Sequence, residues 1–229
     1  MHEFLTGSLF PLVLTLLAYQ AGLLLQKKLR TPLCNPILIA VILILAVLNA
    51  VRVETGTYQA SIRSISWLMT PATVCLAIPM YEQVQILKKN LRAILAGVFC
   101  GAVSCLAVIV LFCFLADFDR TLAISLLPKS VTSAIGAPLS DLSGGNAAIA
   151  TAAIVCTGIL ANILSLPLLR LFRLDDPIAQ GVALGTSGHV VATTKANEID
   201  PLAGAVSSLS LVAAGLLTAI FFPLAVGLL

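Results

Sequence analysis

The chain has 229 residues, of which 59% are hydrophobic and only 10% are charged, and its mean hydropathy is +1.08. A soluble domain carries about 25% charged residues, so this composition excludes a soluble globular protein and predicts an integral membrane protein. The formal net charge of +3 comes mostly from lysine and arginine between the apolar runs, and we expect no nucleic-acid partner.

Long uncharged runs divide the chain. A membrane-spanning helix needs about 20 apolar residues, and runs of this length without alternation argue against a β-barrel. Six runs qualify: Phe4–Gln26, Thr31–Val51, Ser64–Tyr81, Ala93–Ala116, Leu142–Leu169 and Pro201–Leu229. Thr121–Asp141 and Ile178–Glu198 are apolar but interrupted by polar residues. We expect an all-α integral membrane protein with about seven or eight transmembrane segments, two of them broken or re-entrant, in a single transmembrane domain over residues 1–229.

Lysine and arginine mark cytoplasmic loops. Basic clusters follow the first and third runs: Lys27, Lys28 and Arg30, then Lys88, Lys89 and Arg92. This places the N-terminus outside. Arg170 and Arg173 then lie inside if Thr121–Asp141 turns back as a re-entrant hairpin, and outside if it crosses fully. The charge count favours the hairpin.

Two interrupted segments occupy similar places in the two halves of the chain. "TPATVCLAIPMYE" (70–82) precedes a long apolar helix, and "GTSGHVVATTKANEIDP" (185–201) precedes the last one. Paired broken segments indicate the binding site of a transporter built from inverted repeats. The candidate repeat halves are residues 1–116 and 117–229.

The first polar element is "LLPKSVTSAIGAPLSDLSGG" (126–145), which holds two prolines, Pro128 and Pro138. Broken backbone is tolerated at membrane depth only inside protein or beside water, and a lysine there costs a few kcal/mol more. Free amides at the start of a half-helix attract anions. We therefore predict a small anion site made by Lys129, Ser130, Thr132 and Ser133. The alternative is that Lys129 lies at the membrane edge and extends its charge to water.

The second polar element is "GVALGTSGHVVATTKANEID" (181–200), in which Gly181, Gly185 and Gly188 allow close helix contact or a break. Its predicted substrate-binding residues are Gly185, Thr186, His189, Thr193 and Lys195. The ordinary imidazole pKa of ~6.5 suits proton coupling, so His189 is the first candidate proton carrier and Glu198 the second. Alternatively, His189 is a hydrogen-bonded packing residue, and Lys195 and Glu198 form an ion pair near a loop.

Other candidates carry weaker signals. Asn35 before Pro36 is expected to cap a helix, with a cavity-lining role as the alternative. Secondary site candidates are Tyr81, Gly144 and Gly145. The six cysteines lie in apolar runs without metal-ligand spacing, which predicts packing roles and neither a disulfide nor a metal site. No catalytic motif is present, so we expect no enzyme and no cofactor.

At its two polar elements the sequence resembles the LrgB/CidB family, whose bacterial members are often called holin-antiholin-like proteins. "LLPKSVTSAIGAPLSDLSGG" and "GTSGHVVATTKANEID" carry the resemblance, together with "NPILIAV" and "PATVCLAIPMYEQ". It covers essentially the whole chain. Lys195 is a departure, because relatives can carry arginine there, and lysine keeps the charge but loses the bidentate fork.

The resemblance implies two functions. One is regulation of murein hydrolase export and cell lysis together with a small LrgA/CidA-type membrane partner. The other is transport, because the plastidial relative carries glycolate and glycerate and some bacterial relatives are linked to pyruvate. It also implies the bacterial cytoplasmic (inner) membrane and a homodimer within a hetero-complex.

The residues favour transport, since a lysis protein needs no lysine among hydroxyls in a broken helix. We expect an elevator-like carrier of small monocarboxylates, in which Lys129 attracts the carboxylate and the hydroxyls read a 2-hydroxy or 2-oxo oxygen. A third reading, an assembly module that only anchors the partner, leaves both polar elements unexplained.

Overall fold

The computed structural model describes residues 9–29, 35–53, 55–62, 67–68, 71, 74–75 and 77–229, and every regular element in these ranges is an α-helix. The chain divides into two compact units, Met1–Cys75 and Leu76–Leu229. The predicted run Ser64–Tyr81 and the segment 70–82 lie partly outside the described residues, and α7 (Ala77–Glu82) covers the end of both. The all-helical prediction is confirmed for the part of the chain that the structure describes.

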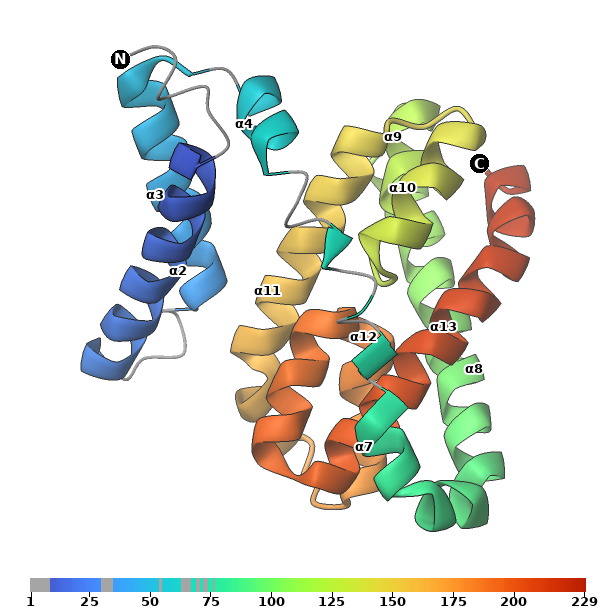
Figure 1. The fold of residues 1–229 in the computed structure, drawn as a ribbon. Helices are drawn as coiled ribbons and strands as arrows, with labels where there is room; N and C mark the ends of the chain where they lie inside the picture. Colours follow the sequence, from blue (N-terminus) through green and yellow to red (C-terminus); the bar gives the residue numbers. More distant parts are fainter. Residues whose placement is uncertain are drawn as a thin grey trace. The chain divides into compact units, whose positions relative to one another are not determined.

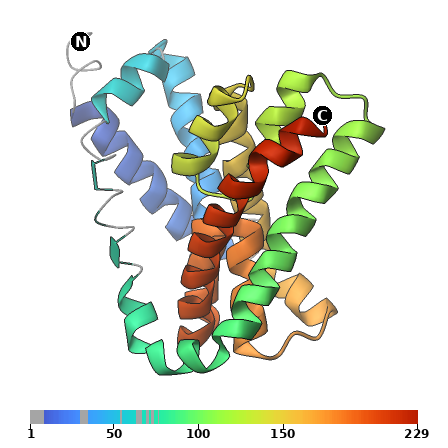
Figure 2. The ribbon, with the colours of Figure 1, turned by 90° about the vertical axis from the view of Figure 1, so that its right-hand side faces the viewer.

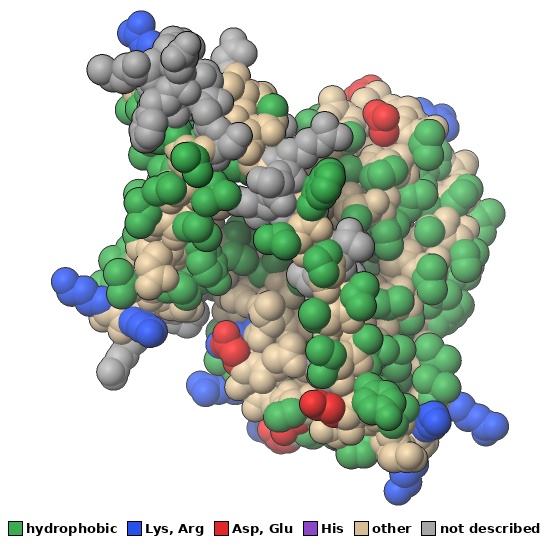
Figure 3. Space-filling model, in the orientation of Figure 1, with side chains coloured by type: hydrophobic (Ala, Val, Ile, Leu, Met, Phe, Trp, Pro, Cys, Tyr) green, Lys and Arg blue, Asp and Glu red, His purple; other side chains and the backbone are tan. Residues whose placement is uncertain are grey.

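Four described helices are long and apolar enough to cross a membrane: α2 (Leu9–Leu29), α8 (Val84–Leu115), α11 (Ala147–Leu171) and α13 (Pro201–Gly227). A shorter apolar helix, α3, covers Pro36–Val51. In the second unit, apolar side chains cover the middle of the surface and charged ones gather toward its two ends (Figure 3). These features are those of a multi-pass membrane protein.

The first unit is built on the pair α2 and α3, with α4 (Thr55–Ser61) beside them. A Cβ atom at Gly22 would lie 2.6 Å from the carbonyl oxygen of Pro36, so the two helices meet closely there. The hydroxyls of Thr15 and Tyr58 lie 2.6 Å apart and join α4 to α2.

The second unit contains α7 (Ala77–Glu82), α8, α9 (Arg120–Leu126), α10 (Ser133–Leu142), α11, α12 (Pro177–Ile199) and α13. Helices α8 and α13 run in the same direction (Figures 1 and 2). Near the start of α8, Ile94 shares a core cluster with Val206, and near its end Ile109 shares one with Phe222. Between these clusters the rings of Phe99 and Phe221 meet edge to face, with centroids 5.8 Å apart.

The segment Thr121–Asp141 is a hairpin of two short helices, α9 and α10, joined by a non-helical stretch at 127–132. A Cβ atom at Gly136 would lie 3.1 Å from that of Pro128, so the two arms run antiparallel. The predicted break after Pro128 is confirmed. Pro138 lies inside α10, which continues past it to Leu142. Since proline has no backbone N–H, the carbonyl of the exposed Ala134 loses its partner within the helix.

Helix α12 is a second hairpin. Gly188 (φ −128°, ψ 15°) and His189 (φ 44°, ψ −139°) leave helical geometry and reverse the chain. The arms on either side of this reversal both lie along α13. Gly185 and Thr193 both contact Ser207, on opposite sides of the reversal. The break therefore falls at Gly188–His189, while Gly185 serves close helix contact.

The two hairpins enter the second unit from opposite ends (Figure 1). The first begins near the end of α8, where Ala123 packs with Cys113. The second begins near the start of α8, where a Cβ atom at Gly97 would lie 3.0 Å from Val182. Each is followed by a long helix, α11 after the first and α13 after the second, and these two helices run in opposite directions (Figures 1 and 2).

Helix caps follow the same order in residues 120–171 and in residues 177–227. Asp119 caps α9 and Asp176 caps α12, each by accepting a hydrogen bond from a first-turn backbone N–H. Asn146 caps α11 and Asp200 caps α13, each by accepting from two backbone N–H groups. Residues 120–171 thus share one plan with residues 177–227, whereas the sequence had suggested 70–82 as the counterpart of 185–201.

Gly181 gives a direct test of the close contact between α12 and α13. A Cβ atom there would lie 2.6 Å from the carbonyl oxygen of Ala203 and 2.7 Å from the Cβ of Val206. We expect Gly181→Ala to destabilise the protein by about 1–3 kcal/mol through overpacking, seen as a lower thermal unfolding midpoint in detergent. Gly227→Ala is the matched control, because nothing lies within 4 Å of its added Cβ. Equal midpoints for the two variants would contradict the packing.

Candidate functional site

Both hairpins contact one residue of α11, Ile154. A Cβ atom at Gly136, next to the first reversal, would lie 2.6 Å from Cδ1 of Ile154. At the second reversal, Nε2 of His189 lies 2.9 Å from the carbonyl oxygen of the same Ile154. Ile154 is the eighth residue of α11, about 10 Å along the helix from its start. Both hairpins are therefore held against the same part of α11, inside the apolar layer.

The first reversal, residues 127–132, carries the cation. Lys129 is partly buried and its Nζ donates to Oγ of Ser130 over 3.1 Å. No carboxylate lies within 4 Å of this ammonium among the described residues. A cation without an anionic partner in such a place favours an anionic ligand.

Hydroxyl groups continue beyond Lys129. Thr132 is the N-cap residue of α10, with φ −72° and ψ 149°, yet its side chain makes no capping hydrogen bond. Ser133 opens the helix. The start of α10 thus presents two hydroxyls and first-turn amides next to the lysine, which are the donors that a small carboxylate needs.

The second reversal places His189 in a buried and strained position. Its φ of 44° with ψ of −139° is a turn conformation that glycine usually supplies, and such a conformation costs a larger residue of order 1–3 kcal/mol. Gly158 makes room for the ring, because a Cβ atom there would lie 2.5 Å from Cε1 of His189. Strain held in place by close packing is a common mark of a functional position.

Hydrogen bonds define the proton positions around this reversal. A carbonyl oxygen only accepts, so Nε2 of His189 carries the proton shared with Ile154, and Nδ1 is the acceptor in the neutral ring. The hydroxyl of Thr193 donates to the carbonyl of His189 over 2.9 Å. Its oxygen lies 2.8 Å from Oγ of Ser207, which therefore donates to it.

Sequence reasoning missed Ser207 and Ser210, which α13 brings to the second hairpin. Both are fully buried. Oγ of Ser210 has no hydrogen-bond partner within the described residues, and the Cβ of this serine would lie 2.8 Å from a Cβ atom at Gly185. The signal was present in the sequence as "SSLS" (207–210) within an otherwise apolar run.

Other predicted residues lie away from the two reversals. Lys195 and Glu198 form an ion pair of 2.7 Å on the second arm of α12, with side chains 24% and 65% exposed. The expected pairing is thus seen, at about two helical turns from His189 along the second arm. The hydroxyl of Thr186 donates to the carbonyl of Val182 over 2.7 Å and is committed to its own helix.

The secondary candidates lie outside this cluster. Asn35 belongs to the first unit and caps α3 by accepting from Ile37 N over 2.9 Å. Tyr81 is 80% exposed on α7. Gly144, with φ 89°, and Gly145 form the turn from α10 into α11. Asn35, Gly144 and Gly145 therefore serve helix ends and connections.

A comparison with known families agrees with the resemblance seen in the sequence. The family model described as LrgB-like family matches residues 15–228. No solved structure matches the chain. The family match includes both hairpins and the long helices that follow them, and the chain therefore belongs to the LrgB-like family.

Proposed function

We propose that this protein is a secondary transporter of small monocarboxylates, with the substrate bound between the reversals of the two hairpins. The observation that carries the proposal is that both hairpins contact Ile154, while Lys129 in the first reversal has no carboxylate within 4 Å among the described residues. Transporters with inverted repeats bind their substrates near the membrane midplane at broken helices of this kind.

The substrate class follows from the groups present. Lys129 attracts the carboxylate, and the first-turn amides of α10 add donors to it. Ser130, Thr132 and Ser133 supply hydroxyls for a 2-hydroxy or 2-oxo oxygen. The family resemblance adds glycolate, glycerate and pyruvate as specific candidates. Lys195 is a weaker candidate for this contact, because Glu198 already neutralises its charge.

Proton coupling falls to His189 in this proposal. Its Nδ1 is free to take a proton while Nε2 keeps its hydrogen bond to Ile154. Thr193 and Ser207 hold the backbone of His189 in place. Glu198 is the second candidate, and its exposure gives it access to water.

The mechanism is alternating access by an elevator-like movement. Residues 120–171 and 177–227 form an inverted repeat in this proposal, so movement of the second unit exposes the cluster to either side of the membrane. A scaffold is required, and an LrgA/CidA-type partner in a complex with a homodimer of this chain is the candidate that the resemblance supplies. The membrane is the bacterial cytoplasmic membrane.

Counterflow in proteoliposomes tests the anion site. We expect saturable exchange of radiolabelled glycolate or pyruvate by the wild type, with or without the partner, and at least about 10-fold less by Lys129→Ala, since one charge-assisted contact is worth about 1.5–3 kcal/mol. Lys88→Ala, the same change at a lysine near the start of α8, should leave exchange unchanged. Undiminished uptake by a folded Lys129→Ala protein would refute this site.

The alternative function has its own outcome in the same experiment. A holin- or antiholin-like regulator of murein hydrolase export would show no saturable flux in the wild type, alone or with the partner, although the protein is folded. In that case Lys129→Ala should change autolysis of cells and no solute flux.

A separate measurement tests the proton role of His189. We expect His189→Gln to keep a donor toward Ile154 but to remove the imidazole nitrogen that accepts the proton. Anion counterflow should then persist, while the net flux driven by an imposed pH gradient should fall to the level seen without the gradient. A variant that still follows the pH gradient would move the coupling role to Glu198 or to another ion.

A further inference from the structure

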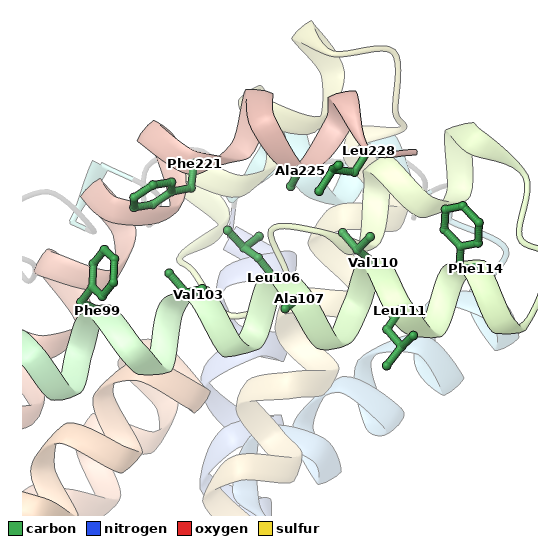
Figure 4. Close-up of a pocket in the computed structure, with 10 residues that line it drawn as sticks. All are labelled: Phe99, Val103, Leu106, Ala107, Val110, Leu111, Phe114, Phe221, Ala225 and Leu228. Carbon is green, nitrogen blue, oxygen red and sulfur yellow. The ribbon is translucent and has the colours of Figure 1, made fainter.

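The second unit has an apolar groove on its surface that the transport proposal does not use. It lies between α8 and α13 and has a volume of about 540 Å³ (Figure 4). Phe99 and Phe221 lie at one end and Phe114 at the other, as the close-up shows. Ala107 and Ala225 line the stretch between them, where their small side chains leave space between two parallel helices.

The dimensions of the groove fit a hydrocarbon chain. Phe99 and Phe114 are 15 residues apart on α8, about 22 Å along the helix axis. This exceeds the ~15 Å of hydrocarbon in one leaflet. The volume spread over this length gives a cross-section of roughly 25 Å². A groove of this width accommodates one extended chain and does not enclose an α-helix, which is about 10–12 Å across with its side chains.

Polar groups lie at one end of the groove. A second cavity of about 150 Å³ shares Phe114 with it and is lined also by Asp117 and Arg120. These two side chains carry opposite charges, yet neither takes part in an ion pair among the described residues. The carboxylate of Asp119, by contrast, is committed to the backbone N–H of Thr121 over 3.0 Å.

We propose that the groove and this cavity together bind one phospholipid with a phosphoethanolamine headgroup. One acyl chain lies along α8 between Phe99 and Phe114. The guanidinium of Arg120 binds the phosphate, and the carboxylate of Asp117 accepts hydrogen bonds from the primary ammonium. An anionic headgroup without an amine would set its charge beside Asp117, and a quaternary choline has no N–H to donate to it.

Lipid-dependent thermal unfolding of the delipidated full chain in detergent tests this proposal. We expect dioleoyl phosphatidylethanolamine, at about 100-fold above its Kd, to raise the unfolding midpoint by about 5–10 °C. The phosphatidylglycerol and phosphatidylcholine lipids with the same chains should raise it less. Native mass spectrometry should show one retained phosphatidylethanolamine per chain. Equal shifts with all three lipids would overturn the headgroup assignment.

Two variants separate the parts of the site. Ala107→Phe fills the groove and should abolish the lipid shift, whereas Val108→Phe, at a neighbouring position that is 63% exposed and does not line the groove, should keep it. Asp117→Asn should reverse the preference from phosphatidylethanolamine to phosphatidylglycerol. Asp117 has a φ of 51°, which asparagine also adopts readily, so this variant keeps the fold. Retained preference in Asp117→Asn, or retained shift in Ala107→Phe, would refute the proposal.

Discussion

An unpaired backbone N–H or C=O group in hydrocarbon costs several kcal/mol, and the second unit is arranged around the two places where its chain nevertheless reverses inside the apolar layer. Each reversal is enclosed by helices. The first lies against α11, and the second lies between α11 and α13. The helices that shield the irregular backbone from lipid also enclose its polar side chains. The polar cluster in the interior of the second unit therefore follows from this shielding.

Small residues make this enclosure possible. Gly136 and Gly158 let the two hairpins approach α11, and Gly181 and Gly185 let the first arm of α12 approach α13. Close approach of this kind is the usual way in which helices pack within membranes. The same contacts fix His189 in a backbone conformation that a residue with a side chain does not favour. The close packing therefore maintains the strain at this reversal.

Local chemistry explains which features the sequence could predict. Pro128 removes a helical donor and Lys129 is costly at membrane depth, so the sequence itself indicates a break in the helix at the first reversal. The spacing of Lys195 and Glu198 likewise predicted their ion pair. The second reversal was less visible, because Gly188 is one of several glycines in its segment. Ser207 and Ser210 escaped notice because serine in an apolar helix usually bonds its own backbone. The shared plan of residues 120–171 and 177–227 lies in caps and turning points more than in residue identities.

The two reversals are held in place by different kinds of interaction. The second is tied to its neighbours by side-chain bonds from His189 to Ile154, from Asn162 to Val191 and from Thr193 to Ser207. The first, among the described residues, has one side-chain bond, between the adjacent Lys129 and Ser130. Local opening costs the bonds and contacts that it breaks. The stretch 127–132 is held by apolar packing instead, because Leu127 and Val131 are only 1% and 2% exposed. The cation of Lys129 is thus positioned by packing, whereas the histidine is positioned by hydrogen bonds.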